Sequence, residues 1–194
     1  MNETIHLSTL RLNLRPVRND DFDSWAAMLA DPEATRSIGG PKSRLEAWNM
    51  FRAVGGAWHF DGHSCFSIFE KASGRWVGCA GVLRREELRT PESVAGIVSD
   101  RWRRGYVVEA LTAVLDWTFD RFGFDEVISY VPSNHVISRN AARKLGATYR
   151  GLARLPASLV GEELPAEVWV INREEWLLDR SSDVIWAPRY LGEM

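Results

Sequence analysis

The sequence lacks the features that mark membrane, secreted and nucleic-acid-binding proteins. It has only two cysteines in 194 residues, and both stand alone among apolar neighbours. We therefore expect free thiols in a reducing cytoplasm rather than a disulfide framework, and no Cys/His grouping has the spacing of a metal site. No apolar run approaches the roughly 18 residues of a membrane span, and no secretory signal is evident. A net charge of −2 disfavours a nucleic-acid partner, which requires a basic surplus.

What is present is the composition of one globular domain. Hydrophobic residues make up 45% and charged residues 26% of the chain, which is ordinary for a folded protein. The length allows one sizeable hydrophobic core. Because no repeat, low-complexity stretch or linker divides the chain, we predict a single domain over residues 1–194. Its aromatic tail, residues 174–194, is expected to pack on that domain.

Strand and helix patterns alternate along the chain. Alternating apolar and polar residues before Pro16 indicate a half-buried first strand. Ser43 and Glu46 form a capping box at a helix start, and Gly74 marks the turn of a hairpin. The predicted strands are residues 10–15, 65–70, 75–83, 93–99, 127–131, 147–155 and 168–172, and the predicted helices are 19–29, 43–56, 107–122 and 138–145. This order predicts an α/β (α+β) fold, with a mixed, mostly antiparallel sheet of about six to seven strands, about four flanking helices and one β-helix-β crossover.

A short basic loop stands directly before a long amphipathic helix. The loop contains Arg103, Arg104 and Gly105, and apolar residues recur at three- and four-residue steps from Val107 onward. A helix start has unpaired N–H groups and partial positive charge, so this loop suits a pyrophosphate. It also follows a crossover strand, whose carboxyl end is where such folds place their sites. A solvated basic loop in front of a core helix is the alternative.

Five segments in matching order resemble the RimJ/RimL-like branch of the GNAT superfamily, the acyl-CoA-dependent N-acetyltransferases. They are Leu10–Pro16, residues 19–33, residues 102–110, Ser138–Ala147 and Asn172–Trp176. Together they span nearly the whole chain. The resemblance implies a GNAT-like domain that moves an acetyl group from acetyl-CoA to a primary amine by direct attack in a ternary complex, without a metal.

The resemblance also implies which residues bind acetyl-CoA. Backbone N–H groups near Ile97 and Val98 are expected to hold the pantetheine and the thioester carbonyl oxygen. The residues implied at the pyrophosphate are Arg103, Arg104, Gly105, Tyr106 and Val107. The superfamily favours Gly or Ala where Val107 stands, so we expect a tighter loop here.

Ser138 matches the family serine near the CoA sulfur, and is implied as a CoA contact and as the proton donor to the leaving thiolate. A helix N-cap is the plain alternative for this serine, and Tyr130 and Tyr149 are alternative donors. The family places an asparagine three residues before the serine. Here His135 occupies that register and Asn134 lies one residue earlier, so either side chain is a candidate for the contact.

Glu92 is the implied general base, because the family often carries a carboxylate at the start of this strand that deprotonates the amine through water. Glu86, Glu87 and His135 are alternatives, as is an amine that arrives neutral.

The acceptor stays open between a peptide α-amine and a small-molecule amine, and a homodimer stays open as well. Trp48, Trp58 and Trp169 are candidates to line an acceptor cleft between the early helices and the late strands. Two other functions fit the same residues. One is a catalytically silent acyl-CoA-binding module, and the other is a transferase that uses another acyl-CoA such as succinyl-CoA.

Overall fold

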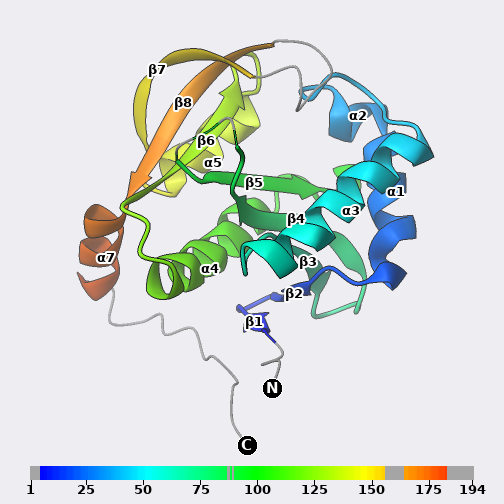
Figure 1. The fold of residues 1–194 in the computed structure, drawn as a ribbon, viewed down its shortest axis with the longest axis horizontal. Coiled ribbons are helices and arrows are strands. Elements are labelled where there is room, and N and C mark those ends of the chain that lie inside the picture. Colours follow the sequence, from blue (N-terminus) through cyan, green and yellow to red (C-terminus); the bar gives the residue numbers. More distant parts are fainter. Residues whose placement is uncertain (1–4, 87, 89, 156–163, 183–194) are drawn as a thin grey trace, which may run out of the picture.

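A computed structural model describes residues 5–86, 88, 90–155 and 164–182 (Figure 1). In these residues eight strands form one sheet with the order β1-β2-β3-β4-β5-β6-β8-β7. The strands are β1 (Leu7–Ser8), β2 (Leu12–Pro16), β3 (Cys65–Glu70), β4 (Trp76–Leu83), β5 (Glu92–Ile97), β6 (Glu126–Pro132), β7 (Thr148–Leu155) and β8 (Leu164–Asn172). The described helices are α1 (Phe22–Ala30), α2 (Pro32–Thr35), α3 (Arg44–Phe60), α4 (Tyr106–Arg121), α5 (Val136–Lys144) and α7 (Arg173–Ser182), with short 3-10 turns η1 (Asn19–Asp21) and η2 (Ser99–Arg101).

The sheet is mixed and mostly antiparallel, as predicted. Among the described strands only β5 and β6 pair in parallel, and α4 connects them. The seven predicted strands are present, and the eighth, β1, has two residues and is too short to give a sequence pattern. The helices beyond the predicted four are α2, a single turn that Pro32 starts after the Asp31 cap, and α7, at the start of the aromatic tail.

The sheet is buried on both faces, each against different helices. In β3, Phe66 and Ile68 pack in one apolar cluster with α4, whereas Cys65 packs in a second cluster with α1 and α3. This division follows from the alternation of side chains along a strand. Trp176 docks α7 on the α4 side through an indole N–H that donates to Asp116 at 2.8 Å. Residues 183–194, the rest of the predicted tail, lie outside the described residues.

Two helix boundaries differ from the prediction. Helix α3 runs through its two glycines to Phe60, because Trp58 near its end packs on Phe66 with ring centroids 4.8 Å apart. Helix α5 begins at Val136 with His135 as the N-cap residue, so Ser138 is not the cap. None of the helices in the described ranges is long and apolar enough to cross a membrane.

Candidate active site

Strands β5 and β6 separate soon after they begin. Their pairing joins Glu92 to Ile128, and the Ile128 N–H donates to the Pro91 carbonyl at 2.9 Å. One residue later the Ser93 hydroxyl donates to the Ile128 carbonyl at 3.3 Å. Beyond this point β5 stays paired with β4 and β6 with β8, and the two strands diverge (Figure 1). The side of β5 that faces β6 is therefore unpaired over residues 94–97, which we call the open edge.

The open edge presents the N–H group of Ile97 but not that of Val98. The Val98 N–H donates to the Val77 carbonyl of β4 at 3.0 Å. Because consecutive residues of a strand direct their backbone groups to opposite sides, those of Ala95 and Ile97 face β6. The Ile97 carbonyl accepts the indole N–H of Trp102 at 2.7 Å. Of the two predicted pantetheine donors, Ile97 is oriented toward the open edge, whereas the Val98 N–H is already bonded within the sheet.

The loop of residues 102–106, called the nest loop below, has a backbone suited to an anion. Arg103 has a φ of 59° and Gly105 a φ of 80°, both left-handed. Successive N–H groups converge in turns of this kind and form anion-binding concavities. The first bond inside α4 runs from the Glu109 N–H to the Gly105 carbonyl at 3.1 Å, so the earlier N–H groups of the helix have no intrahelical acceptor. A pyrophosphate fits this set of donors.

One carboxylate, Glu70 at the end of β3, anchors the nest loop from the side. It accepts hydrogen bonds from the hydroxyls of Ser73 and Tyr106, each at 2.6 Å. These bonds, from Ser73 first and Tyr106 second, lower the pKa of Glu70 to about 2. The Arg104 guanidinium lies 4.0 Å from the same carboxylate and is half exposed, and Arg103 is exposed. Tyr106 thus holds the loop through its phenol, and the two arginines are accessible to a ligand.

Glu92 is buried at the start of β5, where its carboxylate lies 2.5 Å from Nε of Arg85. Burial raises the pKa of Glu92, although the charge and the hydrogen bond of Arg85 act in the opposite direction. The pKa of Tyr130 on β6 is raised first by burial and then by the charge of Glu92. Tyr130 lies two residues beyond Ile128, the strand partner of Glu92, and therefore on the same face of the sheet as Glu92. Of the alternative bases, Glu86 is exposed and Glu87 lies outside the described residues.

At the start of α5 the side chains of His135 and Ser138 are in hydrogen-bond contact. Nδ1 of His135 lies 2.6 Å from Oγ of Ser138. Burial lowers the pKa of His135, which favours the neutral imidazole. Asn134 is exposed, and His135 is the side chain that contacts the serine. Which of the two takes the role of the family asparagine stays a prediction. Tyr149, an alternative donor, packs instead on Trp169 with ring centroids 5.7 Å apart.

Comparison with known proteins assigns this architecture. Residues 11–148 match the family described as the acetyltransferase (GNAT) domain. The chain belongs to the GNAT acetyltransferase family. Among solved structures it is similar to an acetyltransferase from Agrobacterium tumefaciens str. C58, with 27% identity, a TM-score of 0.75, and coverage of 86% of this chain and 94% of that chain.

Two further GNAT structures carry CoA. One is Mycobacterium smegmatis RimJ in complex with CoA-disulfide, with 20% identity, a TM-score of 0.71 and coverage of 88% of both chains. The other is RimL, a ribosomal L7/L12 alpha-N-protein acetyltransferase in complex with coenzyme A, with 15% identity, a TM-score of 0.70, and coverage of 88% of this chain and 98% of that chain. At these identities the likeness shows that the chain shares their fold.

Val107, which stands where the GNAT pattern favours Gly or Ala, directs its side chain toward the core. Val107 is half-buried and packs on the apolar cluster beneath α4. Its branched side chain therefore has space on the core side of the helix, and the nest loop keeps its left-handed residues.

The predicted tryptophan cleft is wrong. Trp48 packs edge-on against Phe22 on the side of α1 and α3. Trp58 lies on the α4 side, where its indole N–H donates to the Cys65 carbonyl at 2.9 Å, and Trp169 belongs to the same α4-side cluster. Spacing along the chain does not reveal which face of the sheet a tryptophan covers, so the sequence could not separate these positions.

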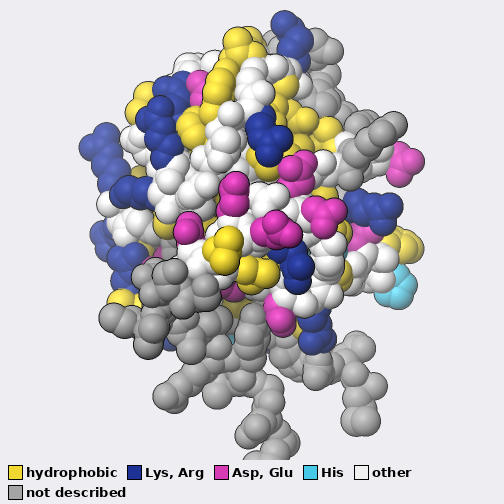
Figure 2. Space-filling model, turned by 90° about the vertical axis from the view of Figure 1, so that its left-hand side faces the viewer, with side chains coloured by type: hydrophobic (Ala, Val, Ile, Leu, Met, Phe, Trp, Pro, Cys, Tyr) yellow, Lys and Arg dark blue, Asp and Glu magenta, His cyan; other side chains and the backbone are white. Residues whose placement is uncertain are grey.

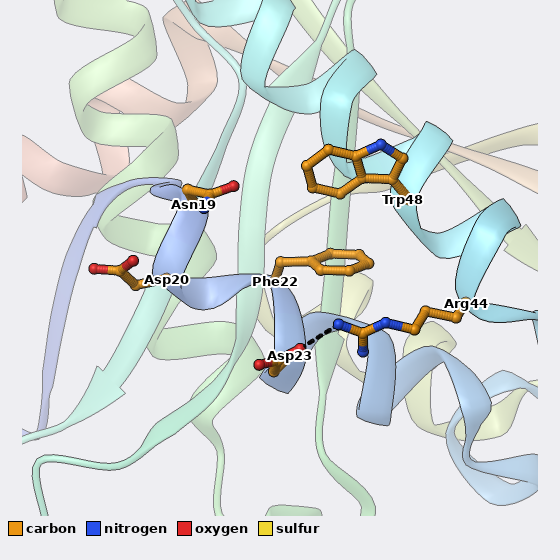
Figure 3. A pocket seen from close by; sticks show the side chains of 6 residues that line it. All are labelled: Asn19, Asp20, Phe22, Asp23, Arg44 and Trp48. Atoms are coloured by element: carbon orange, nitrogen blue, oxygen red, sulfur yellow. Dashed lines mark hydrogen bonds and ion pairs between the residues drawn. The ribbon is translucent and has the colours of Figure 1, made fainter.

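A surface depression of about 420 Å³ lies between the starts of α1 and α3 (Figure 3). It is lined by Asn19, Asp20, Phe22, Asp23, Arg44 and Trp48. Arg44 lies across it, paired with Asp23 at 2.5 Å and stacked over the Phe22 ring at 4.6 Å. None of the residues implied at CoA or in proton transfer lines this depression, so it is separate from the candidate active site.

Proposed function

We propose that this GNAT protein is an acetyl-CoA-dependent N-acetyltransferase that moves an acetyl group to a primary amine by direct attack in a ternary complex. The observation that carries this is the succession of two backbone sites. The open edge of β5 suits the pantetheine amides and leads into the nest loop, which suits the pyrophosphate. The CoA named in the RimJ and RimL structures supports the same assignment. We include in the proposal one acetyltransferase domain over residues 1–194 and a cytoplasmic location.

In this proposal four groups of the chain serve the reaction. Glu92 accepts, through water, the proton that the amine loses, and its raised pKa makes it a stronger base than an ordinary carboxylate. The Ile97 N–H stabilises the oxyanion formed when the amine nitrogen attacks the thioester carbon, an effect of about 3 kcal/mol for one such donor. As the C–S bond breaks, the Ser138 hydroxyl gives its proton to the thiolate. His135, 2.6 Å from that hydroxyl, relays the replacement proton: Nδ1–H gives its proton to the serine oxygen while Nε2 takes one from solvent, so the ring stays neutral.

The proposed acceptor is a peptide α-amine or a small-molecule amine. RimL is named for an alpha-N-protein activity on a ribosomal protein, which supports a protein N-terminus. Tyr130 belongs to a small apolar cluster, in which it packs with Ile38 and Leu164 against Ala166. Because Tyr130 lies on the same face of the sheet as Glu92, two residues beyond its strand partner Ile128, this cluster is the surface we propose for the apolar part of an acceptor.

Calorimetry with CoA and a free-thiol assay with acetyl-CoA test this function. We expect CoA to bind, and thiol to be released only when an acceptor from a panel of amines and N-terminal peptides is present. CoA binding without turnover on any acceptor would indicate a silent acyl-CoA-binding module. Turnover with succinyl-CoA alone would indicate another acyl donor, and a failure to bind CoA would overturn the proposal.

A further inference from the structure

We propose that Arg11, which precedes β2, is a positioning residue for CoA: it fixes the peptide between Arg104 and Gly105 so that the nest loop presents its N–H groups to the pyrophosphate. This inference rests on the proposed function, because it concerns the same CoA site. Arg11 is far from the loop in sequence, yet its Nη1 donates to the Arg104 carbonyl at 2.8 Å.

The Arg11 guanidinium bridges the loop and the first turn of α4. Its Nε donates to Glu109 at 2.7 Å, and its Nη2 lies 2.6 Å from the same carboxylate. The guanidinium carbon also sits 4.7 Å from the centre of the Tyr106 ring. A planar guanidinium with several donors in fixed directions can make all these contacts at once.

Glu109 is itself held, so Arg11 has a fixed partner. The carboxylate accepts the Thr9 hydroxyl at 2.6 Å and the backbone N–H of Arg11 at 2.8 Å. The Arg11 side chain is 43% exposed, so apolar burial does not explain its placement. Its position follows from the hydrogen bonds to Glu109 and to the Arg104 carbonyl.

The geometry of one peptide group connects these contacts to CoA. The Arg104 carbonyl and the Gly105 N–H belong to the same planar trans peptide, so they point in opposite directions. When Arg11 holds the carbonyl, the Gly105 N–H is directed away from the Arg11 guanidinium. Two residues of the loop are left-handed, Arg103 at φ 59° and Gly105 at φ 80°. An arginine rarely adopts this conformation, so the loop needs contacts that hold it.

The test compares two acetyl donors, of which one lacks the pyrophosphate. The Arg11→Ala variant should bind CoA about 10- to 100-fold more weakly by calorimetry, the range expected for a lost hydrogen bond to a charged group. Its turnover with S-acetylpantetheine, which has no pyrophosphate, should stay within about twofold of wild type. Arg11→Lys keeps the positive charge but lacks the several fixed donors of the guanidinium, so it should bind CoA with intermediate affinity.

Arg44→Ala is the matched control. Arg44 also pairs with a carboxylate, Asp23, and stacks on a ring, Phe22, but it lies away from the nest loop. We expect its CoA affinity to equal that of wild type. CoA affinity within about twofold of wild type in Arg11→Ala, or an equal loss of turnover with both donors, would overturn the role of Arg11. If the wild type showed no turnover, the proposed enzymatic function would be refuted. The role of Arg11 would still be tested, because calorimetry compares the CoA affinity of wild type and Arg11→Ala without turnover.

Discussion

Among single residues, Glu92 has the environment that most directly sets reactivity. The residue is 4% exposed and its carboxylate pairs with Arg85 at 2.5 Å, and burial raises its pKa above the ordinary value of 4.5. A base acts only when deprotonated, so kcat should fall as the pH drops through this raised pKa. The Glu92→Gln variant keeps the size of the side chain and an acceptor for Arg85. It should lose about 100-fold in kcat, together with the acidic limb of the pH profile.

The measurement is the pH dependence of kcat at saturating acetyl-CoA. Glu86→Gln, on the exposed loop before β5, is the control and should behave as wild type. An acidic limb that persists in Glu92→Gln would assign that limb to another group and remove Glu92 from the reaction.

Ser138 and His135 form the second local pair with a consequence for turnover. Their side chains are 2.6 Å apart, so removal of either one interrupts a shared proton path. Ser138→Ala and His135→Asn should each lower kcat about 10- to 100-fold, and the double variant should lower it no further than the worse single variant. The thermal melt is the control and should stay near wild type, which separates loss of the proton path from loss of the fold. Losses that multiply in the double variant would show that the two side chains act independently.

At the scale of elements, the start of α4 is where the proposed pyrophosphate site depends on backbone conformation. Gly105 is left-handed, and a Cβ there would meet only Nη2 of Arg11, at 3.5 Å. Asp and Asn both tolerate this conformation better than other side chains, so the two variants differ chiefly in charge. Gly105→Asp should abolish CoA binding in calorimetry with an unchanged thermal melt, whereas Gly105→Asn should bind measurably. Full CoA affinity in the Asp variant would place the pyrophosphate elsewhere.

Elements with short-range signals were predictable from the sequence. The capping box of Ser43 and Glu46, the turn at Gly74 and the end of a strand at Pro16 each act over a few residues, and each is present. The start of α5 was predicted wrongly, because the capping preference of Ser138 gave a signal and the actual cap, His135, gave none.

Contacts that depend on the folded sheet were not predictable. The nest loop is one contiguous stretch, so its left-handed glycine and its place before a helix can be read along the chain. Its support cannot, because Arg11 and Glu109 are 98 residues apart. The same holds for the Val98 N–H, whose bond to Val77 depends on the pairing of β4 and β5. The sequence thus predicted a glycine-containing loop before α4 but not the residues that hold it in shape.

At the scale of the whole molecule, charge is unevenly distributed although the net charge is −2. Figure 2 shows acidic side chains gathered near the centre of one face, the side on which α7 lies in Figure 1. The exposed acids of α4 and α7 include Asp120, Glu174 and Glu175, whereas Arg103 and Arg104 are exposed at the opposite end of α4, on the nest loop. The start of α4 therefore offers two exposed arginines to a polyanion such as CoA.

Glu70 connects this charge distribution to the stability of the fold. It joins the end of β3 to α4 through Tyr106 at 2.6 Å, and to η2 through Arg101 at 3.3 Å. Its pKa is about 2 in the folded protein against an ordinary value of 4.5. A carboxyl with a lower pKa in the folded state stabilises that state when ionised. This stabilisation is complete above the ordinary value and is lost as the pH falls toward about 2.

The free energy of unfolding should therefore decrease between about pH 5 and pH 2, and Glu70→Gln should reduce that dependence. Urea denaturation at several pH values measures it, with Glu174→Gln, an exposed change on α7, as the control. An identical pH slope in Glu70→Gln and wild type would show that this carboxylate does not link stability to pH.

Because Tyr106 and Arg101 share Glu70 as a partner, the same variant should also weaken CoA binding at neutral pH. Stability in acid and affinity for CoA would then change together through one side chain.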